Sequence, residues 1–539
     1  MQKHSLSYRE TNYFTAVITD YLDQKENVKP FYELFPTLDN FGKQITSKQE
    51  NYNAAGGGEK RTALINVLEE QYRDLQTSEA TAKNIALLAN DKTFTVTTGH
   101  QLNLFTGPLY FLYKIVTAIN LAADLKKAYP EYNFVPLYWM ATEDHDFEEI
   151  SFFHLHGKKF QWNPPDSEKT GGPVGEFPTE GLQDVFELFS AEIGNSKNAE
   201  QLKIWFEKAY LQHENLADAT RYLANELFGE EGLVILDAHR PELKRFFTPY
   251  VKEELFQQLS FRNVKETSET LEKNGYAVQV NPREINLFYM EQGLRERIIE
   301  KDGKFFVHEQ EISWTREELE KLVDEHPERF SPNVLLRPLY EEVILPNLCY
   351  IGGGGELAYW LQLKALFESV KVTFPILLLR NSVLLQSKKQ DQKRQKLNIS
   401  LQELFLKPHE LINRKVRKIS NIDIDFSPQK EHLVEQFSGL YELAEQTDKS
   451  FLNAVKAQEV KQLKGLEHLE KRLLKAQKRK LEDEVSRIAA LQQDLFPGKG
   501  LQERHHNFSE FYLEYGEHLV VGLLEQLRPL DLKFDILSL

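Results

Sequence analysis

The chain has 539 residues, a formal net charge of −16 and a single cysteine. A hydrophobic fraction of 41%, with 35 Phe and 22 Tyr, is enough for a large core and excludes global disorder. The acidic balance disfavours a protein that binds the phosphates of DNA or tRNA, because such proteins normally present a basic face. The single cysteine and the absence of an apolar run of roughly 18 residues predict a cytoplasmic protein without a membrane span.

Five short apolar segments predict buried strands. They cover residues 92–98, 133–142, 232–238, 334–339 and 374–380. Before them, residues 1 to about 90 favour helices that are interrupted at 51–60, where Gly56, Gly57 and Gly58 predict a mobile loop. After the first strand, apolar residues between 111 and 123 recur every three or four positions, the spacing of an amphipathic helix. Strands that alternate with helices indicate an α/β protein with a doubly wound, largely parallel sheet.

Uneven strand spacing predicts segments inserted into this core. About ninety residues separate the second strand from the third, and about ninety more separate the third from the fourth. We therefore expect a core over 91–384 with insertions at about 150–230 and 240–330. The second insertion carries possible β-structure at 275–281 and 303–309.

The composition changes after residue 384 and predicts a helical coiled-coil arm over 385–500. Residues 431–495 are charged and contain no proline, and Leu466, Leu469 and Leu473 are spaced three and then four apart. This heptad-like seam favours an antiparallel helical hairpin. Residues 501–539 return to a mixed apolar pattern, and we expect this tail to pack back onto the core.

The first candidate site lies where the first strand passes into a helix, in TTGHQLNLFTGPLYFLYK (97–114). Ligands of doubly wound sheets bind beyond the carboxyl ends of the strands. Gly99 lets the backbone approach a ligand, and Pro108 suits the first position of a helix whose free N–H groups attract an anion. His100 would add a donor or a positive charge, and Lys114 would add another. The alternative is a tight strand-to-helix turn with a capping histidine.

The second candidate site follows the second strand, in WMATEDHDFEE (139–149). Glu143, Asp144 and Asp146 surround His145 and could bind an amine, hold a metal or act as a general base. The alternative is a solvated acidic loop that caps the next helix.

The third candidate site is IGGGGELAYW (351–360). A run of four glycines is costly to order, so it suggests a nest of backbone donors for an anion, with a flexible connector as the alternative. Arg337, upstream, could pair with a carboxylate or a phosphate. Arg380 and Ser382 form a weaker motif after the last strand. Cys349 lies among apolar residues, which favours a buried small hydrophobe over a nucleophile.

These three motifs together resemble the bacillithiol biosynthesis cysteine-adding enzyme family, and the resemblance covers the whole chain. It implies a Rossmann-like core with inserted connecting segments and a C-terminal coiled-coil domain that supports a homodimer. It also implies a ligase that joins the carboxyl group of L-cysteine to the amine of glucosaminyl-malate, the last step of bacillithiol assembly. These are small-molecule substrates, and no nucleic acid is involved.

The resemblance also implies a nucleotide. The family core is similar to nucleotidylyltransferases and class I aminoacyl-tRNA synthetases, which bind ATP phosphates through a His-x-Gly-His motif. Gly99 and His100 match its second half, whereas position 97 is Thr, so the first histidine is absent. Because an amide bond needs an activated acid, we expect ATP or another nucleotide. The sequence leaves open whether a metal takes part.

The catalytic candidates on this interpretation are His100, Glu143, Asp144 and His145. His100 and residues 107–109 would stabilise a phosphate, and Asp144 or Glu143 would hold the cysteine ammonium and deprotonate the amine. His145 is the alternative base, and Arg337 and Arg380 would bind the malyl carboxylates. The substrate- or nucleotide-binding candidates are Thr98, Gly99, Gln101, Asn103, Gly107, Pro108, Tyr110, Lys114, Asp146, Arg337, Gly352, Gly353, Gly354, Gly355, Glu356, Tyr359, Arg380 and Ser382.

Two other classes of function compete with the ligase. A nucleotidyltransferase with another small-molecule acceptor would use the same sheet and phosphate loop. A non-enzymatic coiled-coil scaffold would use the glycine motifs only structurally. A role on tRNA is disfavoured by the net charge of −16.

Overall fold

A computed structural model describes residues 2–164 and 172–539. The chain divides into two compact units. The sheet unit comprises residues 1–9, 13–384 and 502–537. The helical unit comprises residues 10–12, 385–501 and 538–539. Among the described residues, no helix has both the length and the apolarity needed to cross a membrane.

A five-stranded parallel sheet forms the centre of the sheet unit, in the order β13-β12-β2-β3-β6. The strands are β2 (Thr93–His100), β3 (Asn133–Met140), β6 (Val234–Asp237), β12 (Asn347–Gly352) and β13 (Ile376–Leu379). Counted along the chain, the spatial order is 5-4-1-2-3, so the direction of winding reverses between β2 and β12. This is the Rossmann order, and it confirms the predicted α/β fold class.

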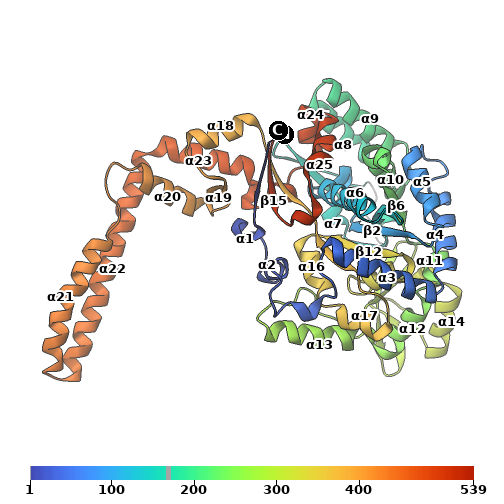
Figure 1. Ribbon diagram of the computed structural model, residues 1–539, viewed down its shortest axis with the longest axis horizontal. Helices are drawn as coiled ribbons and strands as arrows, with labels where there is room; N and C mark the ends of the chain where they lie inside the picture. The colour runs from blue at the N-terminus through green and yellow to red at the C-terminus, as the bar shows by residue number, and fades with distance from the viewer. Residues whose placement is uncertain (1, 165–171) are drawn as a thin grey trace. The chain divides into compact units, whose positions relative to one another are not determined.

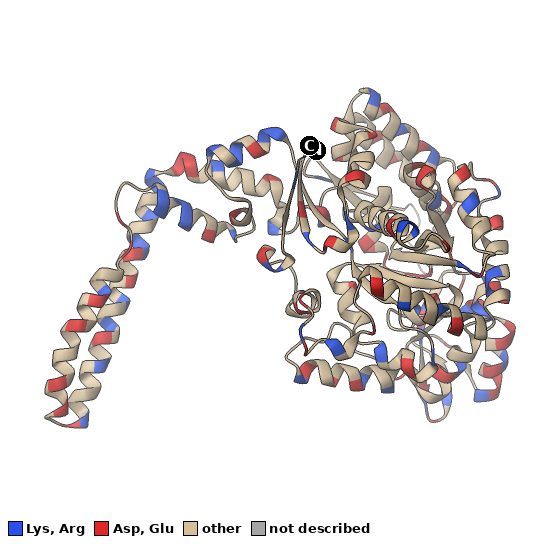
Figure 2. Ribbon diagram, in the orientation of Figure 1, with Lys and Arg blue, Asp and Glu red and all other residues tan. Residues whose placement is uncertain are grey.

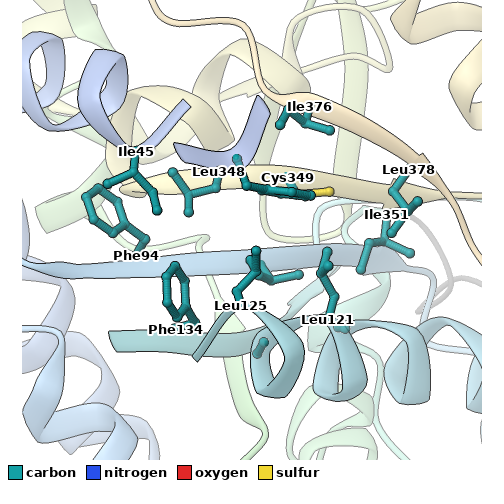
Figure 3. Packing of buried hydrophobic residues seen from close by; sticks show 14 residues of the cluster. Ile45, Phe94, Leu121, Leu125, Phe134, Leu348, Cys349, Ile351, Ile376 and Leu378 are labelled. Carbon is teal, nitrogen blue, oxygen red and sulfur yellow. The ribbon is translucent and has the colours of Figure 1, made fainter. Parts of the chain in front are cut away.

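Helices α3 (Leu38–Ala54) and α6 (Tyr110–Ala128) pack on the sheet and complete its core. Phe94, Phe134 and Leu348 come from three neighbouring strands and meet Ile45 of α3 and the leucines of α6, as Figure 3 shows. Cys349 lies fully buried in the same cluster, as expected for a small hydrophobe. The α6 helix carries its apolar face over β2 and β3 because its buried residues recur at three and four positions.

One predicted strand is wrong. Residues 334–339 form no strand; helix α15 (Arg337–Ile344) begins there, and the fourth core strand is β12. Pro338 occupies the first turn of α15, where its missing N–H costs nothing. The predicted segment 334–339 covers only the turn before α15 and its first three residues, a stretch too short for its periodicity to separate a helix from a strand. The other four predicted strands are confirmed as β2, β3, β6 and β13.

The first 90 residues are mainly helical, as predicted. Besides α3, they contain β1 (Gln2–Leu6), α1 (Tyr8–Thr11), α2 (Ala16–Leu22), α4 (Gly57–Gln71) and α5 (Glu79–Leu87). The interruption expected at 51–60 is shorter than predicted, because α3 extends to Ala54 and α4 begins at Gly57. Gly56 makes the turn, with a φ of 81° that favours glycine.

Two insertions are carried on the sheet. The first contains β4 (Phe152–Leu155), β5 (Lys158–Gln161), α8 (Leu182–Ile193), α9 (Lys197–Leu211) and α10 (Leu216–Phe228). The second contains α11 (Pro241–Lys244), α12 (Thr248–Gln257), α13 (Leu259–Lys273), α14 (Arg316–Glu325) and an antiparallel sheet in the order β10-β9-β8-β7-β11. Those strands are β7 (Leu287–Glu291), β8 (Leu294–Lys301), β9 (Lys304–Val307), β10 (Ser313–Trp314) and β11 (Phe330–Pro332). Residues 275–281 form no strand.

The C-terminal tail of the sheet unit contains α24 (Phe508–Tyr515), α25 (His518–Gln526) and β15 (Phe534–Ser538). The α24 helix packs on α9, and α25 packs on α6. A three-stranded sheet has the order β1-β15-β14, where β14 is Ser382–Gln386.

The helical unit contains the predicted hairpin, formed by α21 (Ser427–Glu445) and α22 (Lys449–Lys480), which lie side by side in Figure 1. Three residues connect these two helices, so they run antiparallel. The remaining helices are α18 (Lys388–Lys396), α19 (Leu401–Leu404), α20 (Pro408–Ile419) and α23 (Glu482–Leu495). Phe437, Ala444 and Val455 form a small buried cluster between the two hairpin helices.

Candidate active site

A cavity of about 590 Å³ lies at the carboxyl edge of the parallel sheet. Its lining includes Gly99 and His100 at the end of β2 and Gly353 just beyond the end of β12. The winding of the sheet reverses between these two strands, and a reversal of this kind leaves a crevice where ligands of doubly wound folds bind. The loop after β3 and Arg380 after β13 complete the edge.

All three motifs singled out from the sequence contribute to this one cavity. Thirteen of the candidate residues line it: Gly99, His100, Gln101, Tyr110, Lys114, Asp144, His145, Arg337, Gly353, Gly355, Glu356, Tyr359 and Arg380. The histidine motif, the acidic loop and the glycine segment come from distant parts of the chain, and the parallel register of the sheet brings them together.

Lys114 and Glu356 join the histidine motif to the glycine segment. The Lys114 Nζ atom donates to the carbonyl of Gly99 at 2.6 Å and to Glu356 Oε1 at 2.7 Å. Glu356 Oε2 accepts from the backbone N–H of Gly353 at 2.7 Å, and Oε1 also accepts from Tyr350. The glycine segment therefore gives the Gly353 N–H to its own glutamate, and Glu356 has little capacity left for a ligand.

Close approach explains two of the glycines. A Cβ atom at Gly99 would stand 3.3 Å from the hydroxyl of Tyr350, and one at Gly352 would stand 2.7 Å from a side-chain carbon of Leu357. The α16 helix (Gly354–Trp360) begins directly after this turn. Gly352 thus lets the start of α16 fold closely against β12, and Gly99 lets β2 approach Tyr350 of β12.

Two arginines of the cavity, Arg337 and Arg504, leave positive charge available, whereas a third, Arg380, is neutralised. Arg380 pairs with Glu503 at 2.7 Å, and both side chains are less than 5% exposed. Arg337 and Arg504 also line the cavity, and within the described residues neither has an acidic partner at ion-pair distance. The guanidinium groups of Arg380 and Arg504 lie 5.0 Å and 5.9 Å from the centre of the Tyr110 ring.

Asp144 supplies an ionised carboxylate to the cavity. Its Oδ2 accepts from Gln101 at 3.1 Å, and its Oδ1 accepts from the backbone N–H of His145 at 2.8 Å. Burial alone would raise the pKa of Asp144, but the charges of Arg337 and Arg295 and these hydrogen bonds together lower it. A carboxylate held in this way can bind an ammonium group.

Glu143 does not line the cavity, and this corrects its assignment as a candidate base. Its Oε1 pairs with Lys244 at 2.6 Å, and its Oε2 accepts from the Ser331 hydroxyl at 2.7 Å. Burial would raise the pKa of Glu143, but Lys244 and His239 hold it well below its usual range. Both of its carboxylate oxygens are therefore engaged outside the cavity, whereas Asp144, the next residue in the turn after β3, lines it.

His145 lines the cavity as a hydrogen-bond donor. Arg295 Nη1 lies 2.5 Å from His145 Nδ1, and because arginine can only donate, Nδ1 accepts and the ring proton resides on Nε2. Burial and the Arg295 charge lower the pKa of His145, so the ring is neutral at pH 7. With its lone pair occupied, His145 is poorly placed to act as the base.

His100, unlike His145, has a buried ring nitrogen that lacks a hydrogen-bond partner in the described part of the chain. It is 7% exposed, and among the described residues its Nε2 atom has no hydrogen-bond partner. Burial and the charges of Lys114 and Arg380 lower the pKa of His100 well below its usual value, so the expected positive charge is absent. A hydrogen bond between the His100 ring and the Thr106 backbone favours the charged form, which indicates that the ring donates this bond. In the neutral ring the donor nitrogen carries the proton, so Nε2, which has no partner within the described residues, keeps its lone pair.

Gly107 and Pro108 lie outside the cavity, which corrects the predicted anion-binding helix end. The α6 helix begins at Tyr110, and the N–H of Leu109 already donates to the carbonyl of His506. Asn507 donates to the carbonyls of Phe105 and Gly107. The turn therefore packs against the C-terminal tail, a partner that local sequence cannot reveal.

Six further candidates also lie outside the cavity lining: Thr98, Asn103, Asp146, Gly352, Gly354 and Ser382. Thr98 donates to the carbonyl of Ile351 and Asn103 to that of Glu149, so both hold neighbouring segments together. Asp146 is exposed at the start of the short helix α7 (Phe147–Ile150). The Ser382 hydroxyl accepts from Arg380 and orients it.

Three charged residues of the cavity escaped the sequence interpretation: Arg295, Glu341 and Arg504. Arg295 lies on the antiparallel sheet of the second insertion, and Arg504 on the tail, so neither adjoins a core strand end. Glu341 lies one helical turn after Arg337 on α15, a relation hidden while this segment was predicted as a strand. Correct helical spacing would have revealed it.

The donor set of the cavity suits anionic and amine ligands more than a metal. In the part of the chain that the structure describes, no group of three or more His, Cys, Asp or Glu side chains is arranged to hold a metal ion. The available cations and the lone pair of His100 fit phosphate or carboxylate groups and a proton-donating amine.

Comparison with known proteins identifies the family. Residues 1–381 match the family model described as bacillithiol biosynthesis BshC, N-terminal Rossmann-like domain, and residues 383–539 match its C-terminal coiled-coil domain. A relative from Christiangramia forsetii is 63% identical over 100% of this chain and 99% of its own length, and one from Flavobacterium johnsoniae is 57% identical over 100% of both. A relative from Bacillus mycoides is 26% identical over 97% of this chain and 98% of its own length.

All three relatives carry the name "Putative cysteine ligase BshC". The two family models meet near the end of the parallel sheet, and together they cover nearly every residue. The chain therefore belongs to the bacillithiol biosynthesis BshC family.

Proposed function

We propose that this ligase joins the carboxyl group of L-cysteine to the amine of glucosaminyl-malate, with the carboxyl group activated by ATP or another nucleotide. The observation that carries the proposal is the single cavity at the reversal of the sheet. It combines unneutralised guanidinium groups, one ionised carboxylate and one neutral imidazole with an unpaired nitrogen. These are the groups that an amide-forming site between an amino acid and an anionic amine requires.

Asp144 binds the ammonium group of cysteine in this proposal. Its lowered pKa keeps it ionised at pH 7, as an anchor for an ammonium group requires. Glu143 cannot share this role, because its two oxygens are occupied by Lys244 and Ser331.

His100 takes the proton of the attacking amine. The amine nitrogen forms the new C–N bond, the bond from the carboxyl carbon to the activating group breaks, and the amine proton moves to Nε2. The support for this role is geometric: His100 lines the cavity, and within the described residues its Nε2 atom has no hydrogen-bond partner. General-base catalysis of this kind contributes about 10²–10⁴-fold to the rate.

Arg337 and Arg504 bind anionic groups of the substrates. The malyl part of the acceptor carries two carboxylates, and a nucleotide carries phosphates, so either fits two guanidinium groups without ion-pair partners. Lys114 and Arg380 contribute less net charge, because Glu356 and Glu503 neutralise them. A nucleotide, when bound, supplies the leaving group that makes the cysteine carboxyl reactive.

We further propose that the protein acts in the cytoplasm as a homodimer joined through the helical unit. Apolar side chains on the hairpin support this: Leu443 is 54% exposed, Leu469 is 53% exposed and Phe451 is 44% exposed. Sedimentation of the full chain tests it, and a monomer at all concentrations would refute it.

The ligase proposal is tested with pure protein, L-cysteine, glucosaminyl-malate and ATP. Mass spectrometry measures bacillithiol, and chromatography measures whether AMP or ADP accumulates. We expect product only with nucleotide, and a loss of about 10²-fold or more in the His100→Ala variant. Asp144→Asn should chiefly raise the KM for cysteine. Turnover without nucleotide would refute activation, and full activity of both folded variants would refute the site.

A further inference from the structure

The cavity contains one acidic side chain with an unsatisfied oxygen. Glu341 lines the cavity at 2% exposure, and within the described residues its Oε1 atom has no hydrogen-bond partner. Buried polar oxygens in folded proteins nearly always have a partner. A buried oxygen left without one at the wall of a ligand-sized cavity is therefore a position that a ligand can complete.

The surroundings of Glu341 favour its neutral form. An ionised carboxylate buried without a cation is very costly. Of the cations that act on Glu341, Lys48 pairs with Glu342, and within the described residues Arg337 does not lie at ion-pair distance from Glu341. Burial and the charge of Glu342 raise the pKa of Glu341 well above its usual range, against the effects of Arg337 and Lys48. A neutral carboxyl group has an O–H to donate.

Arg337 and Glu341 lie four residues apart on α15, so both can face the same part of the cavity. Together they present guanidinium N–H groups and one carboxyl O–H. We propose that Arg337 and the protonated Glu341 form a joint receptor for one anionic group of a substrate, a carboxylate or a phosphate. This inference rests on the proposed function and adds a specific residue and ligand chemistry to it.

The proposal distinguishes Glu341 from an ammonium anchor. A protonated carboxyl group that donates to an anion can be replaced by an amide, because glutamine keeps an N–H donor in the same place. A carboxylate that binds an ammonium cannot be replaced in this way. The Glu341→Gln and Glu341→Leu variants therefore give opposite patterns for the two roles.

The test is calorimetric titration of the full chain with L-malate and, separately, with pyrophosphate. We expect Glu341→Gln to bind within about threefold of the parent, whereas Glu341→Leu should bind about tenfold to a hundredfold more weakly, the range for a lost hydrogen bond to a charged group. Weakening confined to malate identifies a carboxylate as the ligand, and weakening confined to pyrophosphate identifies a phosphate. Glu269→Gln, on the exposed face of α13, is the matched control and should bind like the parent.

The pH dependence provides a second readout. The charged groups around Glu341 are Arg337 and Glu342 on α15, Lys48 on α3 and Glu356 on α16, and α4, which also packs on α15, carries Lys60. All of them remain in Glu341→Gln, so a difference between the two proteins isolates Glu341. Anion affinity of the parent should fall as rising pH removes the Glu341 proton, and the variant should lack that component.

Three results would overturn the inference. Equal weakening in Glu341→Gln and Glu341→Leu would show that the charge of Glu341 matters and not its proton. Parental affinity in a Glu341→Leu variant with a native melting profile would show that no ligand contacts Glu341. If the parent binds neither malate nor pyrophosphate, the anion-binding part of the proposed function fails as well, so the two failures are distinguishable.

Discussion

The two units of the chain hold their charges in different ways. In the sheet unit, Arg380 and Glu503 pair with both side chains less than 5% exposed. In the helical unit, Glu470 accepts from Arg417 and Lys430, whose side chains are 39% and 27% exposed. Figure 2 shows both signs of charge interspersed along the hairpin helices. Buried pairs fix the geometry at the cavity, whereas exposed pairs contribute little to stability.

The sheet unit also contains a larger apolar core cluster than the helical unit. One cluster of the sheet unit joins 14 buried residues from four strands and two helices. The clusters of the helical unit contain three buried residues each. All five tryptophans lie between residues 139 and 360 of the sheet unit, so fluorescence follows the unfolding of that unit alone. The two units can therefore be compared within one protein.

The largest stability effect is expected from Glu503→Gln. The substitution leaves the buried guanidinium of Arg380 without its counter-charge, and breaking a buried pair in this way costs about 3–5 kcal/mol. Tryptophan fluorescence during urea unfolding measures the loss. A change below about 1 kcal/mol would mean that solvent reaches the pair, and the contrast between the two units would then disappear.

A core truncation should have the next largest effect. Leu348 on β12 is fully buried in the sheet cluster, and Leu348→Ala removes apolar contacts and leaves a cavity, which costs about 2–5 kcal/mol. The fluorescence transition should move to lower urea, while helical circular dichroism should keep a component from the helical unit. If both signals shift together, the two units unfold as one.

Much of this fold follows from local pattern. The segments that became β2, β3, β6 and β13 are apolar runs bounded by turn residues, and the hairpin helices show heptad-like spacing. The pattern fails at α15, because the apolar run 334–339 reaches only the first turn of this helix, which contains Pro338. The inserted antiparallel sheet was only partly foreseen, since many residues of its strands are exposed or half-buried and the strands show no continuous apolar run.

Most cavity residues that adjoin the ends of core strands were predicted from the sequence. Cavity residues that lie on the second insertion or on the C-terminal tail were missed. Asp144 and His100 follow directly from the topology of a doubly wound sheet. Glu143 was wrongly placed because its partner Lys244 is about a hundred residues away. The anion-binding helix end at 107–109 was wrong because the N–H of Leu109 already donates to the carbonyl of His506 in the tail. Sequence pattern identifies which edge carries the chemistry, but long-range partners decide which side chains remain available.

A smaller effect is expected from Glu470→Gln in the helical unit. Hydrogen bonds from Lys430 and Arg417 lower the pKa of Glu470, so its stabilisation is present above the unfolded-state pKa and is lost as pH falls through the folded one. At pH 7 the variant should lose less than about 1 kcal/mol, and its difference from the parent should shrink as the pH falls through the folded-state pKa. Helical circular dichroism over a pH series measures this. A loss that grows in acid would contradict the sign of the pKa shift.

The smallest effect on the stability of the single chain is expected from Leu469→Ala. This side chain is 53% exposed on α22, and surface truncations away from special features usually change stability by about 0.5 kcal/mol or less.

The same substitution also tests the proposed homodimer. If a second copy covers Leu469, truncating this side chain reduces the apolar area that the dimer buries. Within a monomer the change should not depend on protein concentration. If the hairpin pairs with a second copy, dilution should dissociate Leu469→Ala at higher concentration than the parent, because binding to the native state adds stability by mass action. Sedimentation across a dilution series separates these outcomes, and identical dissociation of both proteins would place the dimer contact away from Leu469.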